Sequence, residues 1–82
     1  MSDIEKIIDL AKEHYRQKEY EKAFKLYKQA AEQCNAEAQW LLGLCYKNGE
    51  GVEPDEEQAA YWHRRAMKQG YMDEKGSFGD MI

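Results

Sequence analysis

The feature that most constrains this chain is an internal repeat of apolar and small residues at two fixed offsets. At an offset of 36 residues, the matching pairs are Ala23 and Ala59, Leu26 and Trp62, and Ala30 and Ala66. At an offset of 32 residues, the matching pairs are Leu10 and Leu42, and Ala11 and Gly43. Self-similarity at such spacings is typical of helical solenoids, in which each unit is a helical hairpin stacked on its neighbour. The two offsets differ by four residues, which predicts a longer loop over about 48–54 in the second unit.

Composition agrees with a small all-α domain that spans residues 1–82. The chain has 82 residues, 43% of them apolar, and a single proline, so it is able to build one packed helical core. The net charge of −4 argues against nucleic acid as a partner. The N-terminus shows no secretory leader, and no apolar run approaches the ~20 residues of a membrane span. We therefore expect a soluble cytoplasmic protein without a membrane partner.

Hydrophobic periodicity predicts four helices in two antiparallel hairpins. The first hairpin is expected over about 3–17 and 20–34, and the second over about 36–48 and 55–69. The third helix is apolar nearly all round, as expected of a central helix covered on several sides. The tail over 71–82 combines glycines with apolar residues, and we expect it to cap the fourth helix.

Local signals mark where these helices begin and end. Helix starts are predicted from the capping boxes Ser2–Glu5 and Asp55–Gln58 and from Asn35 as an N-cap. Helix ends are predicted at Gly49 and Gly70, because glycine tolerates the left-handed conformation that follows many helices. The stripe of the second helix is expected to extend to Cys34, and that of the fourth to include Met67.

The second unit carries the features of a known repeat family. The matching positions are Ala36-x-Ala38, Leu42-Gly43, Tyr46, Gly49-x-Gly51-Val52, Asp55, Ala59, Trp62, Ala66 and Gly70. In this pattern, residues 35–70 resemble a complete Sel-one-like repeat (SLR). The first unit, 3–34, resembles a tetratricopeptide repeat (TPR) at Leu10, Ala11, Tyr20, Ala23, Tyr27 and Ala30. It departs from that pattern at His14 and Lys18.

The resemblance implies a right-handed stack of antiparallel helices used as a protein–protein interaction module or adaptor. It implies neither catalysis nor a cofactor. In the tail, Phe78-Gly79 echoes Leu42-Gly43, so 71–82 is either a cap or a partial third repeat. Weak self-association through uncovered ends is an alternative to the cap, and a purely structural end-piece of a longer solenoid is an alternative function.

A different class of function would use the few reactive side chains. His14, Cys34, Cys45 and His63 are the candidates for a small metal- or thiol-dependent enzyme. The two cysteines are eleven residues apart rather than in a close pair such as C-x-x-C, and no catalytic signature surrounds the histidines. We therefore expect free thiols, packing histidines and no metal ion.

Helix geometry predicts a binding surface for another protein or peptide. In TPR-like stacks the first helix of each hairpin lines the concave side. The spacing i, i+4, i+7 places one row of three residues on each of these helices. The two rows are Ile8, Lys12 and Tyr15, and Trp40, Leu44 and Lys47. An apolar strip with a charged rim suits an apolar or amphipathic peptide segment. The alternative is that Trp40 and Leu44 belong to the core or are covered by the tail.

Overall fold

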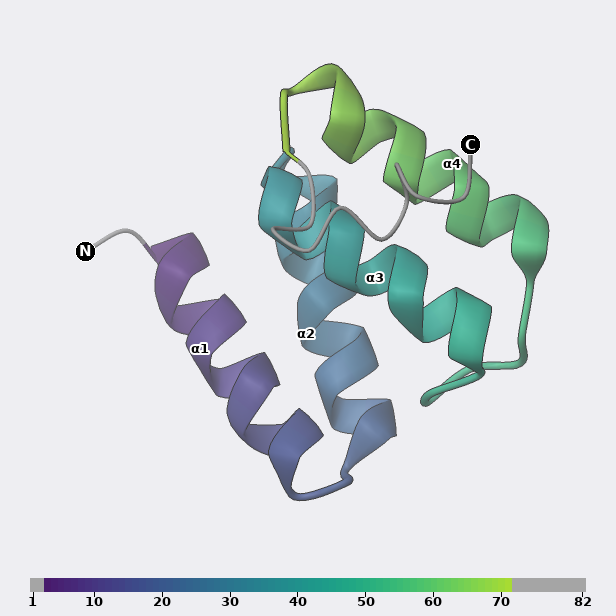
Figure 1. Ribbon diagram of the computed structural model, residues 1–82. Helices are drawn as coiled ribbons and strands as arrows, with labels where there is room; N and C mark the ends of the chain where they lie inside the picture. Colours follow the sequence, from purple (N-terminus) through teal and green to yellow (C-terminus); the bar gives the residue numbers. More distant parts are fainter. Residues whose placement is uncertain (1–2, 72–82) are drawn as a thin grey trace.

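The computed structural model describes residues 3–71, in which all regular structure is helical and no strand occurs. The helices are α1 (Asp3–Arg16), α2 (Tyr20–Glu32), α3 (Ala36–Asn48) and α4 (Glu56–Lys68). Figure 1 shows α1 and α2 as one hairpin, α3 and α4 as the second, and α2 stacked beside α3. The predicted all-α fold of two stacked hairpins is confirmed, with boundaries that differ by one or two residues. The cap expected from the tail involves 72–82, which lie outside the described residues.

The second hairpin begins and ends at the predicted signals. The Asn35 side chain accepts a hydrogen bond from the Ala38 N–H at 2.9 Å, and Asp55 caps α4 in the same way at 3.1 Å from the Gln58 N–H. Gly49 follows α3 with φ of 71°, in the left-handed region that favours glycine. These caps satisfy backbone groups that a helix end leaves open. Ser2, the predicted cap of α1, lies outside the described residues.

Two predicted stripes extend too far. Cys34 is not part of α2, which ends at Glu32; it adopts a positive φ of 67° and is exposed. The turn is closed by the Asn35 N–H, which donates to the Ala30 carbonyl at 3.3 Å, and this geometry directs Cys34 away from the helix stripe. Met67 lies within α4 but is 41% exposed, so it does not belong to the buried side of that helix.

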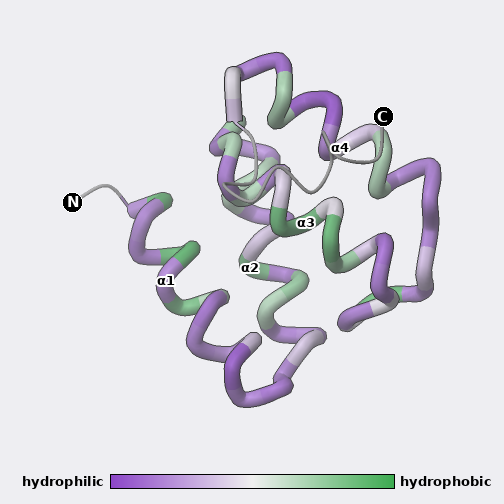
Figure 2. The backbone as a smooth tube through the Cα atoms, viewed as in Figure 1, coloured by the Kyte–Doolittle hydropathy of each residue, from purple (hydrophilic) through white to green (hydrophobic). Residues whose placement is uncertain are grey.

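Small residues allow the helices to pack closely, and the apolar residues of several helices meet in one core. In Figure 2 hydrophobic segments recur along α1 between hydrophilic ones, as expected for a helix with one buried side. The buried cluster consists of Ile8, Ala11, Ala23, Tyr27, Ala30, Ala31, Ala38, Leu42, Cys45 and Trp62. α3 contributes buried residues on several sides because it lies between α2 and α4. The prediction of a central, nearly all-apolar helix therefore describes α3 correctly.

The loop between α3 and α4, within the second hairpin, packs against the first hairpin. Gly51 has φ of 77°, and a Cβ built there would lie 2.3 Å from the Tyr20 carbonyl oxygen. Only glycine fits such a close approach to the first turn of α2. The Asp55 N–H also donates to the Tyr46 carbonyl at 2.9 Å, which ties the end of the loop to α3. This packing brings Glu50 from the second hairpin against the first.

Candidate binding groove

A hollow of about 390 Å³ lies between α1 and α3, with α2 behind it. Its lining, which we call the α1–α3 groove, consists of Lys12, Tyr15 and Arg16 from α1, Tyr27 from α2, and Leu41 and Leu44 from α3. The volume falls within the ~300–1,000 Å³ range of small ligand sites. The groove is built from both hairpins, so it exists only when the two units are stacked.

The aromatic part of the groove is held by contacts outside it. The Tyr15 hydroxyl donates a hydrogen bond to Glu50 Oε2 at 2.7 Å, and the Tyr15 ring packs edge-on against Tyr20 with centroids 5.2 Å apart. Burial and the hydrogen bond to Glu50 raise the pKa of Tyr15 well above its usual value, so the hydroxyl remains a donor at neutral pH. Tyr27 is only 3% exposed and forms the floor. Fixed side chains of this kind lower the entropy cost of binding.

An ion pair bridges the two walls. Lys12 Nζ lies 2.8 Å from Glu37 Oε2, which connects the middle of α1 to the first turn of α3. The hydrogen bond to Glu37 raises the pKa of Lys12, so this side chain is cationic throughout the physiological range. Both side chains are more than a third exposed, so the pair stabilises the fold by ~1 kcal/mol at most.

The structure places three of the six predicted site residues together in the groove. Lys12, Tyr15 and Leu44 line it. Lys47 is exposed on α3 but lies outside the lining. Ile8 and Trp40 are each 3% exposed, which corrects the expectation that they present an open apolar strip.

The burial of the two apolar residues has a packing cause. Ile8 belongs to the main core cluster, on the side of α1 that faces α2. The Trp40 ring lies against His63 of α4, with centroids 4.5 Å apart, and against Tyr71, at 5.9 Å. The Trp40 side chain therefore points toward α4 rather than toward α1. The packing on α4 fits the core alternative for Trp40, and Tyr71, the first residue of the tail, adds to its cover.

Three lining residues were not among the predicted ones. Tyr27 belongs to the apolar stripe of α2, so its periodicity indicates only core. Leu41 stands in a helix that is apolar nearly all round, where periodicity does not distinguish one side from another. Arg16 did carry a usable signal, because it follows Lys12 by four residues and therefore shares its side of α1.

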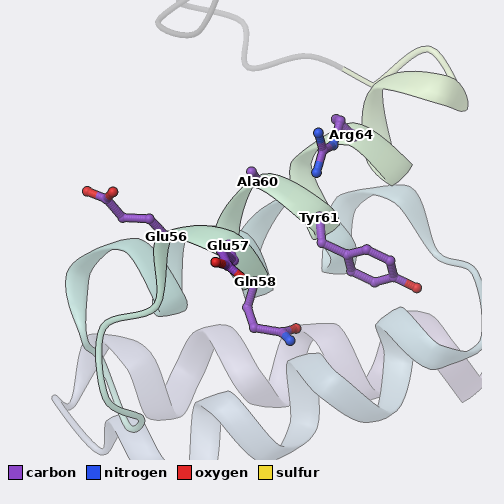
Figure 3. A pocket seen from close by; sticks show the side chains of 6 residues that line it. All are labelled: Glu56, Glu57, Gln58, Ala60, Tyr61 and Arg64. Atoms are coloured by element: carbon purple, nitrogen blue, oxygen red, sulfur yellow. The ribbon is translucent and has the colours of Figure 1, made fainter.

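A larger hollow, of about 580 Å³, runs along the outer side of α4 (Figure 3). Its lining residues all come from this one helix: Glu56, Glu57, Gln58, Ala60, Tyr61 and Arg64. Figure 3 shows these side chains spread along α4, with charges of both signs. A recess between exposed side chains of a single helix lacks the fixed opposing walls of the α1–α3 groove, which is the better candidate for binding.

The reactive side chains considered for an enzyme lie in different surroundings. His14 Nδ1 lies 2.7 Å from Glu19 Oε1, Cys34 is exposed, and Cys45 is buried. Burial raises the pKa of the Cys45 thiol to about 12, so it remains protonated and unreactive at neutral pH. His63 is buried against Gly43 and Trp40. Within residues 3–71, no group of three or more His, Cys, Asp or Glu side chains is arranged to hold a metal ion.

Stacked antiparallel hairpins with a repeated sequence pattern define a helical-repeat protein of the solenoid class. The sequence model of the Sel1 repeat matches residues 9–33 and 36–71, and the chain belongs to the Sel1 repeat family. This confirms the resemblance drawn from the second unit, and the match extends to the first. Repeats of this family generally mediate protein–protein interaction, and proteins built from them are typically non-catalytic scaffolds.

A relative with similar sequence is the uncharacterized protein NMB1327 of Neisseria meningitidis serogroup B. It is 43% identical over 54 residues, which are 66% of this chain and 12% of that protein. The chain thus spans about an eighth of the length of the curated relative it matches. No solved structure matches the chain significantly. Within the part of the chain that the structure describes, no helix is both long and apolar enough to cross a membrane.

Proposed function

We propose that the chain is a non-catalytic adaptor module that binds an apolar or amphipathic peptide segment of another protein in the α1–α3 groove. The observation that carries this proposal is an apolar hollow with prearranged aromatic side chains, formed where the two hairpins meet. Aromatic residues held in position are favoured anchors for a partner's side chains. Lys12, Tyr15 and Leu44 remain proposed contacts, joined by Arg16, Tyr27 and Leu41. Ile8 and Trp40 are buried and are not proposed as contacts of the ligand.

A peptide display experiment tests this proposal directly. Random 12-residue peptides are selected on the purified chain, and the enriched sequences are resynthesised with a fluorophore and titrated by anisotropy. Leu44→Asp places a charge in the groove wall, and we expect it to weaken binding by at least about tenfold, as for an anchor site. Circular dichroism establishes that the variant remains folded, and Tyr15→Ala provides a second loss-of-contact variant.

Leu10 offers a matched control on α1. It is 50% exposed and lies outside the groove lining, so Leu10→Asp makes the same chemical change elsewhere on the surface. We expect this variant to bind the selected peptides as the unmodified chain does. Equal losses in Leu10→Asp and Leu44→Asp, with both variants folded, would show that the peptides bind elsewhere. Concentration-dependent sedimentation abolished by Leu44→Asp would instead identify a second copy of the chain as the occupant.

A further inference from the structure

The two walls of the α1–α3 groove differ in chemistry. The α1 wall presents two cations, Lys12 and Arg16, at i and i+4, and the α3 wall presents Leu41 and Leu44. Within residues 3–71 no carboxylate is part of this lining, although Glu37 of α3 lies beside Lys12 and Glu13 of α1 beside Arg16. A segment lying in the groove therefore meets cations along one side and aliphatic side chains along the other.

Both cations have intramolecular partners, yet both retain capacity for a ligand. Lys12 pairs with Glu37, and Arg16 pairs with Glu13 on its own helix. The side chains are 45% exposed at Lys12 and 75% exposed at Arg16, so these pairs are weak and exchange readily with solvent. An ammonium offers three N–H donors and a guanidinium five, so each is able to donate hydrogen bonds to a further carboxylate.

The overall charge of the chain does not override this local pattern. The net charge is −4, which opposes an acidic ligand at long range. Salt screens exposed charges beyond about 10 Å at 0.1 M ionic strength, whereas a carboxylate in the groove would lie within a few ångströms of Lys12 or Arg16. Contacts at that distance decide which peptide is preferred.

We propose that the partner segment is an acidic amphipathic peptide, with Asp or Glu facing Lys12 and Arg16 and aliphatic or aromatic side chains facing Leu41 and Leu44. This rests on the function proposed above. It adds that the ligand's charge is negative and that this charge faces α1. Such a ligand complements both walls, because charged partners give specificity while apolar contacts give most of the affinity. A basic amphipathic segment would place like charges together along α1.

The enriched display peptides provide the test. We expect Asp or Glu within four positions of their apolar residues more often than in the starting library. Replacing those acids by Asn or Gln in a synthetic peptide is expected to weaken binding about three- to tenfold at 50 mM salt, and less at 500 mM. The double variant Lys12→Gln, Arg16→Gln should lose the same factor for the acidic peptide and leave the amide peptide's affinity unchanged.

Arg64 and Lys68 of α4 supply the control, because they are also exposed, four residues apart and cationic. The double variant Arg64→Gln, Lys68→Gln changes the net charge equally and is expected to bind the acidic peptide normally. Equal affinity for the acidic and amide peptides, a preference for basic peptides, or an equal loss in the α4 variant would overturn the acidic assignment while leaving peptide binding in the groove intact. Peptides that bind Leu44→Asp as well as the unmodified chain would instead overturn the proposed function itself.

Discussion

The two hairpins make equivalent turns with different residues. After α3 and α4 the left-handed positions are Gly49 and Gly70, with φ of 71° and 85°. After α1 and α2 the corresponding positions are Lys18 and Cys34, with φ of 63° and 67°. A side chain in this conformation costs ~1–2 kcal/mol, so the first hairpin carries strain that the second avoids. Local hydrogen bonds close both turns, from the Glu19 N–H to the His14 carbonyl and from the Asn35 N–H to the Ala30 carbonyl, although the residues at positive φ disfavour this geometry.

The same contrast occurs inside the core. Ala11 and Tyr27 of the first hairpin correspond to Gly43 and His63 of the second, at the offsets of 32 and 36. A Cβ built on Gly43 would lie 2.6 Å from two ring atoms of His63, so this glycine makes room for the imidazole. The second hairpin therefore avoids side chains at positive φ in its turns. In its core, however, it has an imidazole, which titrates near neutral pH, where the first hairpin has a phenol.

The largest loss of stability is expected at Gly51, where the α3–α4 loop packs against the first turn of α2. Gly51→Ala puts a methyl group against the backbone of Tyr20 and also forces an L side chain into a positive φ. The steric and conformational costs together predict a loss of about 2–4 kcal/mol in the free energy of unfolding. Urea denaturation followed by circular dichroism measures this loss.

Gly70→Ala separates the two costs. Gly70 has a φ of 85°, but a Cβ added there would meet nothing within 4 Å, so only the conformational cost of ~1–2 kcal/mol applies. If Gly51→Ala were no more damaging than Gly70→Ala, the loop would not be packed on α2 as described. The contact between the α3–α4 loop and α2 would then be less closely packed than the core of either hairpin.

A smaller loss, ~1–3 kcal/mol, is expected for Gly43→Ala, because the new methyl group overpacks the contact with His63. The double variant Gly43→Ala, His63→Ala tests whether His63 is the obstacle. If it is, the loss from adding the methyl group should shrink when the ring is absent, giving a coupling energy in a double-mutant cycle. Additive losses would indicate that the methyl group clashes with the α4 backbone instead.

Sequence reasoning succeeded where a signal is local. Asn35, Asp55 and Gly49 each act on backbone groups within a few residues, so their roles are readable without a tertiary structure. It failed for Trp40, because an all-apolar helix gives no indication of which neighbour each side faces. Lys18 and Cys34 also could not be recognised as left-handed positions, since neither residue type favours a positive φ.

The core contrast also predicts a pH dependence confined to the second hairpin. Burial lowers the pKa of His63 below its usual 6.5, with the Trp40 backbone opposing this shift and the charge of Lys47 adding to it. The folded state therefore prefers the neutral ring. This contribution to stability is complete above the unfolded pKa of about 6.5 and is lost as pH falls through the folded pKa.

Urea midpoints between pH 7.5 and 5 measure this loss, and His63→Gln should flatten the profile. The difference between the two profiles isolates His63 from His14, the other histidine. Tyr27, the first hairpin's counterpart, has a pKa raised by burial and does not titrate in this window. A profile unchanged by His63→Gln would place the pH-sensitive group elsewhere.

The smallest expected effect is a gain in stability. It comes from placing glycine at the two positive-φ positions of the first hairpin, so that its turns match those of the second. Lys18→Gly and Cys34→Gly each relieve the ~1–2 kcal/mol cost of a side chain at positive φ, but they also increase the entropy of the unfolded chain by about 0.4–1 kcal/mol. We expect a net gain of about 0.5–1 kcal/mol for each variant, measured as a rise in the urea midpoint. The gains should add, because the two turns lie at the ends of different helices.

Lys18→Ala is the matched control: it removes the same ammonium and keeps a Cβ, so it should bring no such gain. If Lys18→Ala stabilised the chain as much as Lys18→Gly, loss of the charge rather than release of backbone strain would be the cause.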